Sequence, residues 1–405
     1  MKKLILVCGF VIIGFTPAYA QTGIYIEAGG FAYRYLTEND TENSFTGGYI
    51  KADMNFDLGR LAFKVSPRIR YESLFNEGGA NLIWEDEFRH TFTFSEAYAE
   101  VNLEAFRLGA GKKILKPCLL KESPTCSEDG WSPHDFIDPL PGFDEYLGVP
   151  GVWIRSGGRK LSLELMYSPE WTRSKLPYSG RWSLFQALPA VDFVHLGGGD
   201  KLYASLKAWK GSSLFGVVFY NGNDYAPNGF LDLGGEISHV EYLYPKRTSV
   251  TGQFANYGTL IKRMTLGYSD TGGIGWLEFG GELESQKLSD GGSTGLLIGA
   301  ISSLRVDSIS FEASTPTNLR YGWNNTVYGG VEFEEDDWNI RLPIALVDSY
   351  GIVFLPEIRN RRSCEAFCTF FEVAVRGMVL SGSKDSFLGQ YEDNDRVEVI
   401  MKIGF

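Results

Sequence analysis

The chain has 405 residues, including 28 Phe, 21 Tyr and 48 Gly but only four His, and its formal net charge is −12. This acidic balance, without any block of Lys and Arg, argues against nucleic acid as a partner, because phosphate binding requires clustered basic residues. Four His supply few candidates for acid/base chemistry, so we expect a protein that is not an enzyme.

Residues 1–20 have the pattern of a secretory signal peptide. Two lysines precede an apolar run over residues 4–15, and Ala18 and Ala20 are the small residues that a signal peptidase reads. The run is too short to span a membrane as a helix. We expect cleavage after Ala20, export, and a single domain over 21–405 with a formal charge of −14, since the leader contains two lysines and no acid.

Beyond residue 20 no run of about 18 apolar residues occurs, so a membrane protein of this length would have to be a closed β-barrel. Its strands should alternate between apolar and polar residues. Such alternation occurs in the segments 63–72, 161–168, 277–284 and 327–334. A soluble sandwich also alternates, with its apolar face turned inward, so this pattern alone leaves both architectures open.

Short and long connections alternate along the chain, as in an outer-membrane barrel with short periplasmic turns and long outer loops. Short turns are expected near residues 59–60, 104–105, 157–159, 211–213, 305–308 and 335–337. Long loops are expected near 37–46, 76–87, 116–148, 172–200, 223–235, 316–324 and 381–393. Strands of about 9–11 residues then predict an all-β, transmembrane antiparallel barrel of about 18 strands, within a range of roughly 16 to 20. The regions 236–258 and 338–368 are ambiguous.

The end of the chain carries the most specific motif. Val397, Val399, Met401 and Ile403 share one face of the expected strand, Glu398 and Lys402 lie on the other, and the chain stops at Phe405. This segment resembles the terminal strand of bacterial outer-membrane barrels, in which a final Phe after alternating apolar residues is recognised by the barrel assembly machinery. The resemblance implies insertion into the outer membrane, with that machinery and outer-membrane lipid as partners.

The longest expected loop, 116–148, follows the expected fifth strand, 106–115, and has a net charge of −5. Its acidic residues are Glu122, Glu128, Asp129, Asp135, Asp138, Asp144 and Glu145. In bacterial general porins, which this order of elements resembles, the loop after the fifth strand folds into the lumen, and its acids face basic residues on the wall. The expected inward positions supply such residues: Arg68, Arg70, Arg107, Lys113 and Arg155. The alternative is a solvated outer loop.

These features together predict passive passage of small polar or charged solutes through a lumen that the loop narrows, without a cofactor. Segments 107–113 and 129–139 are also locally similar to alginate-export-like porins. Two other functions stay open: a sheath around a multihaem cytochrome that conducts electrons, and an adhesin or surface anchor. A sugar-stacking track in the lumen, with Tyr203 and Trp209, is a further alternative. The sequence leaves open whether the protein is a homo-oligomer.

Four cysteines follow the leader, and they form two close pairs. Cys118 lies near Cys126, and Cys364 lies near Cys368. An oxidising compartment and an even count favour two disulfides that close short loops. Metal binding is the weaker reading, because no second thiol pair of zinc-site spacing and no His cluster would complete a tetrahedral site.

Overall fold

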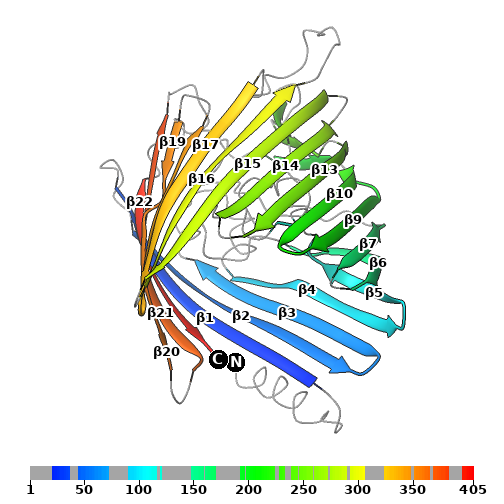
Figure 1. Ribbon diagram of the computed structural model, residues 1–405, viewed down its shortest axis with the longest axis horizontal. Coiled ribbons are helices and arrows are strands. Elements are labelled where there is room, and N and C mark those ends of the chain that lie inside the picture. Colours follow the sequence, from blue (N-terminus) through cyan, green and yellow to red (C-terminus); the bar gives the residue numbers. More distant parts are fainter. Residues whose placement is uncertain are drawn as a thin grey trace.

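The computed structural model describes residues 21–36, 44–72, 90–115, 119–120, 147–158, 160–169, 192–196, 198–223, 228–232, 239–244, 246–258, 260–271, 274–289, 292–305, 323–347, 351–364, 368–382 and 395–405. Most of these residues belong to one β-sheet that curls into a closed barrel (Figure 1). None of the described residues forms a helix long and apolar enough to cross a membrane.

The wall of the barrel is built from strands that pair antiparallel with their neighbours. In chain order they are β1 (Gln21–Tyr35), β2 (Ser44–Leu58), β3 (Leu61–Glu72), β4 (His90–Leu103), β5 (Phe106–Lys113), β6 (Val149–Gly157), β7 (Leu161–Ser168), β9 (Lys201–Lys210), β10 (Ser213–Asn223), β13 (Lys246–Tyr257), β14 (Leu260–Thr271), β15 (Ile274–Ser289), β16 (Gly292–Arg305), β17 (Trp323–Glu335), β18 (Trp338–Val347), β19 (Gly351–Phe354), β20 (Glu357–Ser363), β21 (Phe370–Gly382) and β22 (Arg396–Gly404). The last strand, β22, returns to β1 and pairs with it from Gly404 opposite Glu27 to Arg396 opposite Tyr35. This pairing closes the sheet.

Two short segments, β19 and β20, occupy a single strand position in the wall. β18 pairs with both of them, and so does β21. Between them, the Leu355 N–H donates to the Pro343 carbonyl (3.1 Å) and the Gly377 N–H donates to the Pro356 carbonyl (2.8 Å). The wall therefore has 18 strand positions, which confirms the predicted barrel and its strand number.

The connections at one end of the barrel are short, and the long connections lie at the other end, where only β14–β15 and β18–β19 are joined by a few residues. The turns predicted at 59–60, 104–105, 157–159, 211–213 and 335–337 are confirmed, because each joins two neighbouring wall strands. The turn predicted at 305–308 is wrong. β16 ends at Arg305 and pairs along its length with β17, so residues 306–322 connect the two strands at the end with the long loops. The short-turn end, where β1 starts and β22 ends, is the periplasmic end of an outer-membrane barrel.

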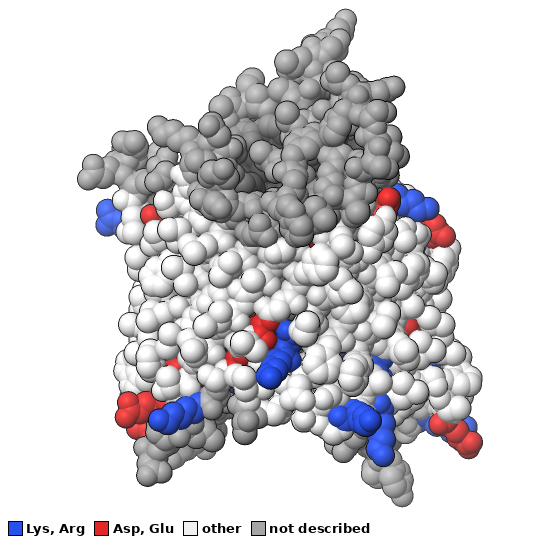
Figure 2. All heavy atoms as spheres, turned by 45° about the horizontal axis from the view of Figure 1, so that its top comes forward, with Lys and Arg blue, Asp and Glu red and all other residues white. Residues whose placement is uncertain are grey.

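Apolar side chains form a band around the outside of the barrel. They take every second position of the strands: on β7, Leu161, Leu163 and Leu165 are 55%, 41% and 40% exposed. Figure 2 shows a largely uncharged surface with charged side chains gathered toward its edges, apart from one small charged group within it. Exposed apolar strands with charged edges are the exterior of a transmembrane barrel.

Four inward aromatic rings lie against glycines on the neighbouring strand. The strand register places Gly29 opposite Tyr49, Gly109 opposite Trp153, Gly299 opposite Tyr328 and Gly404 opposite Phe370. A Cβ atom at any of these glycines would overlap the ring. The missing side chain thus makes room for the aromatic ring, and the pair packs two strands together.

Replacing Gly299 with Ala should lower the free energy of unfolding by about 1–3 kcal/mol, because the new methyl group must displace the Tyr328 ring. Gly281 is the matched control, since a Cβ there meets nothing within 4 Å. Gly281→Ala should leave stability nearly unchanged. Urea titration of the refolded protein in detergent measures both values, and equal effects of the two changes would contradict the prediction.

Two of the long connections contribute a second, smaller sheet. It contains β8 (Asp192–Leu196), β11 (Asn228–Asp232) and β12 (His239–Leu243). β12 pairs antiparallel with β11 and parallel with β8. Because β8 follows β7, and β11 and β12 follow β10, this sheet ties two neighbouring outer loops together.

One of the two expected disulfides, Cys364–Cys368, is present. It closes the turn between β20 and β21, with a Cα–Cα distance of 5.2 Å. Cys118 and Cys126 lie outside the described residues, so the second disulfide stays a prediction.

Peptide mapping without reductant should recover both pairs, 118–126 and 364–368, as intramolecular disulfides. Each short loop should contribute about 2–3 kcal/mol of stability on the loop-entropy estimate. Recovery of free thiols at these four positions, or of peptides that link one pair to the other, would refute the assignment.

Candidate functional site: the inner wall

Polar and charged side chains point into the lumen from the positions that alternate with the apolar band. Ser66 and Arg68 on β3 are buried on this side. We call the lumen-facing side chains of the wall strands the inner wall. Within the described residues, no group of three or more His, Cys, Asp and Glu side chains is arranged to hold a metal ion.

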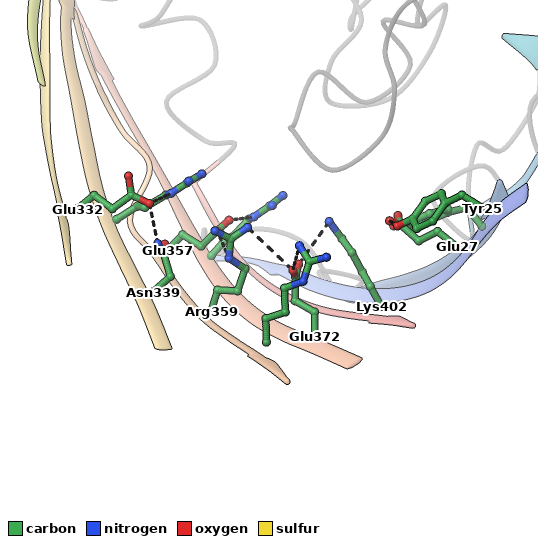
Figure 3. Close-up of polar contacts among 12 residues, drawn as sticks. Tyr25, Glu27, Glu332, Asn339, Glu357, Arg359, Glu372 and Lys402 are labelled. Carbon is green, nitrogen blue, oxygen red and sulfur yellow. Dashed lines mark hydrogen bonds and ion pairs between the residues drawn. The ribbon is translucent and has the colours of Figure 1, made fainter. Parts of the chain in front are cut away.

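Six basic residues lie together on the inner wall from β18 to β22. They are Arg341, Arg359, Arg361, Arg376, Arg396 and Lys402, and we call them the basic cluster. Glutamates separate them. Glu357 pairs with Arg376, and Glu372 lies 3.6 Å from Lys402, 3.9 Å from Arg359 and 4.0 Å from Arg361. Figure 3 shows Glu357, Arg359, Glu372 and Lys402 projecting from adjacent strands toward the inside of the barrel.

Two members of the basic cluster are open to the lumen. Arg341 is 48% exposed at its side chain and donates to Glu332 in an ion pair (2.8 Å), and Glu332 also receives a hydrogen bond from Asn339 (2.6 Å). Arg361 is 54% exposed and lies 3.9 Å above the Phe370 ring. Six cations face four glutamates here when Glu332 and Glu398 are counted, so this side of the lumen is positive while the chain as a whole is acidic.

A recess of about 200 Å³ opens among these residues at the interruption between β19 and β20. Pro343, Leu355 and Met378 form its apolar part, and three arginines and two glutamates surround it: Arg341, Arg376, Arg396, Glu357 and Glu398. The recess therefore offers opposite charges beside an apolar surface.

The charged lining continues onto β1 and β2 through Glu27. Tyr25 and Tyr49 donate hydrogen bonds to its carboxylate at 2.8 and 2.6 Å, and Lys51 lies 3.4 Å away. Tyr25 and Glu27 are visible beside Lys402 in Figure 3. Tyr49 is also one of the rings that pack against a glycine, so its hydroxyl and its ring have separate partners.

A second charged group lies on β3 to β7. Lys64 pairs with Glu96, and Lys113 pairs with Glu164. Glu100 receives hydrogen bonds from the Trp153 indole N–H (2.9 Å) and from Arg155 (3.1 Å). Unlike the basic cluster, each of these cations has its own carboxylate on the same wall.

A third group lies on β14 to β17. Arg263 pairs with Glu282 and, at 2.6 Å, with Glu284. Tyr328 donates a hydrogen bond to Glu282 at 2.8 Å. Arg263 and Glu282 are both almost completely buried, so their charges neutralise each other and are not accessible to a solute.

An apolar cluster lies on the inner wall of β6 to β13, and the chain that follows β5 covers it. Trp153, Tyr203, Val218 and Tyr220 are buried in one cluster with Leu115, which follows β5, and Leu119 packs against it. Leu120, only 4% exposed, packs with Leu214 and Ala255, and the Leu119 N–H donates to the Gln253 side chain at 2.7 Å. The chain after β5 thus turns inward and lies against β10 and β13.

The predicted lumen residues have different environments. Lys113 and Arg155 are neutralised by Glu164 and Glu100 on the same wall, and Arg68 is buried. Arg107 lies on β5 opposite Arg155. The Arg70 side chain and the acids predicted for the loop, Glu122, Glu128, Asp129, Asp135, Asp138, Asp144 and Glu145, lie outside the part of the chain that the structure describes. Tyr203 is buried beneath Leu115 and its neighbours, which removes it from a sugar-stacking track.

The sequence pattern did not predict the basic cluster, because part of the cluster lies in the region 338–368, where the alternation of apolar and polar residues is ambiguous. One signal was present. The run Arg359-Asn360-Arg361-Arg362 is the densest group of basic residues in the second half of the chain. Strand alternation would have assigned Arg359 and Arg361 to one face, although not which face.

No protein-family model matches the sequence, and no curated protein matches it. Solved structures do share the fold. OccAB1 of Acinetobacter baumannii superposes with a TM-score of 0.57 at 9% identity, covering 95% of this chain and 96% of that one. A BenF-like porin from Pseudomonas fluorescens Pf-5 gives 0.54 at 9%, with 96% and 98% covered. OccK9 (OpdG) of Pseudomonas aeruginosa gives 0.53 at 10%, with 96% and 98% covered. The chain has the fold of these bacterial outer-membrane barrels over nearly its whole length.

Proposed function

We propose that the chain is an outer-membrane porin that passes small polar or charged solutes. The observation that carries this proposal is the asymmetry of the lumen. Arg341 and Arg361 are solvent-exposed on one side, while Leu119 and Leu120 cover apolar clusters on the other. Solutes then pass along the charged side. A wall with fixed charges close to the path selects among solutes by their charge.

The structural neighbours support the same function. The one from Pseudomonas fluorescens is described as a BenF-like porin. Passive passage needs no catalytic residue, and we propose no enzymatic activity and no cofactor. We assign the selectivity of the pore to the basic cluster together with Arg68, Arg70 and Arg107, and its narrowing to the acidic loop over 116–148.

Single-channel recording in a planar bilayer tests the proposal. Insertion of purified protein should produce discrete steps in conductance, and the size of the steps should scale with salt concentration. A barrel that serves as a cytochrome sheath or as an adhesin would give no ionic steps, or steps only after a partner protein is removed. Absence of steps from correctly folded protein would overturn the porin assignment.

Assembly of the barrel gives a second test of its location. The Phe405 N–H donates to the Ile26 carbonyl at 2.8 Å, so the last residue pairs with the first strand where the wall closes. We propose that the barrel assembly machinery reads this exposed terminal Phe and that residues 1–20 direct export. Deleting Phe405 should reduce the heat-modifiable folded fraction in outer-membrane preparations, whereas Phe405→Trp should preserve it. An unchanged folded fraction after deletion would exclude that role.

A further inference from the structure

A groove of about 420 Å³ lies on the outer surface of β9, β10, β13 and β14. Its sides are Leu206, Phe215, Met264 and Leu266, whose exposure ranges from 43% to 60%. Gly252 leaves the groove hollow, because it adds no side chain between them. The groove therefore lies in the apolar band, where lipid tails surround the barrel.

The strand register orders this surface into rows that cross the four strands. One row is Leu206, Val217, Gly252 and Leu266, and the next toward the periplasmic end is Ala208, Phe215, Phe254 and Met264. These two rows line the groove. The third row, one step closer to the short turns, is Lys210, Ser213, Asn256 and Lys262. An apolar groove thus ends at a polar row with a lysine on each side.

Both lysines of the polar row are exposed, and neither forms an ion pair with another described residue. Between them, Asn256 donates a hydrogen bond to the Ser213 hydroxyl at 3.0 Å. The two lysines are three strand spacings apart, about 14 Å, and their long flexible stems can bring both ammonium groups toward one headgroup between them. The row lies at the edge of the apolar band, which is the depth at which phospholipid headgroups are found.

We propose that this groove binds one anionic phospholipid of the periplasmic leaflet. An acyl chain occupies the groove, and the headgroup phosphate lies between Lys210 and Lys262. Lipid tails are as apolar as the groove, so burial alone gives no preference over bulk lipid. The preference for one anionic phospholipid over bulk lipid comes from the fit of its acyl chain in the groove and from the charges of Lys210 and Lys262. These are two local cations on a protein whose net charge is −12. The proposal rests on the membrane location proposed above and not on channel activity.

Native mass spectrometry of the full-length mature protein tests the headgroup. The protein is titrated with phosphatidylglycerol or with phosphatidylcholine of identical acyl chains. We expect one phosphatidylglycerol to be retained more tightly than phosphatidylcholine. A basic residue near an anionic headgroup contributes about a fivefold factor. The double change Lys210→Ser with Lys262→Ser should therefore weaken phosphatidylglycerol binding about 25-fold and leave phosphatidylcholine binding unchanged.

A second pair of variants tests the groove and the specificity of position. A Cβ at Gly252 meets only the Leu266 carbonyl oxygen, at 3.7 Å, so Gly252→Leu fills the groove without a backbone clash. Gly252→Leu should weaken the binding of both lipids. Ala208→Leu fills the same groove from β9 and should have the same effect. Lys287, an exposed lysine near the periplasmic end of β15, lies outside the groove. Lys287→Ser is therefore the control and should leave binding unchanged.

Three outcomes would overturn the proposal: equal retention of the two lipids by the unmodified protein, no effect of the double lysine change, or no effect of filling the groove. A dimer mass that Gly252→Leu abolishes would assign the groove to self-association instead. All these residues face away from the lumen, so single-channel conductance should stay at its unmodified value. Loss of lipid preference with normal conductance would therefore separate a failure of this proposal from a failure of the porin assignment.

Discussion

Deleting residues 119–145 should raise single-channel conductance. Leu119 and Leu120 lie inside the barrel against β10 and β13, so the deletion removes chain from the lumen. Because a barrel of 16–18 strands with an open lumen encloses a wide aqueous channel, we expect an increase of roughly twofold or more. The measurement is the distribution of conductance steps in a planar bilayer at fixed salt.

The double change Leu119→Ser with Leu120→Ser is the companion variant. It keeps the length of the loop but weakens its contact with Leu214 and Ala255. Current noise should rise while the mean conductance changes less than in the deletion. Unchanged conductance after deletion, in protein that still shows the heat-modifiable folded band, would mean that the segment after β5 does not narrow the path.

Replacing Arg341 and Arg361 with Ser should shift the reversal potential in the direction of greater cation selectivity. These are the two exposed members of the basic cluster, and their loss changes its balance against the four glutamates from positive to neutral. At roughly 8 Å in water a unit charge contributes about 0.5 kcal/mol, so two charges change the local concentration of a monovalent ion about fivefold before screening. The shift should shrink at high salt, where the screening length falls.

Arg362 is the matched control for this experiment. It neighbours Arg361 on β20 but faces the opposite side of the strand, where it pairs with Asp337 at 3.3 Å. Arg362→Ser removes the same charge from outside the lumen and should leave the reversal potential unchanged. Equal shifts from Arg361→Ser and Arg362→Ser would show that selectivity reflects the overall charge of the protein and not the basic cluster.

Alternation along single strands, the order of short and long connections and the terminal motif together predicted the architecture. Leu161, Leu163 and Leu165 face outward, and the terminal segment that ends at Phe405 closes the wall, both as the sequence indicates. These features are local, because a strand with one face in lipid must repeat every second residue. These local patterns therefore predicted the barrel fold, and the expected strand length placed the number of strands within roughly 16 to 20.

The charge pattern of the lumen was harder to predict, because ion pairs form between strands whose register is not local. Lys113 meets Glu164 and Arg155 meets Glu100 at sequence separations of about 50 residues. Two cations expected to face a solute are therefore neutralised. The basic cluster was hidden for a different reason: Pro343, and Pro356 between β19 and β20, interrupt the regular pairing of this part of the wall, and with it the alternation that identifies a strand.

The rings that pack against glycines also limit how the solute preference of this barrel can evolve. Tyr49, Trp153 and Tyr328 each hold two strands together and donate a hydrogen bond to a glutamate of the inner wall. A mutation that removes one of those glutamates leaves a donor in the wall without its acceptor, so selection for a new solute there conflicts with selection for folding. Arg341 is exposed and carries no such dual role. New solute specificities should therefore arise by substitutions on β18 and β20, while Glu27, Glu100 and Glu282 stay under purifying selection.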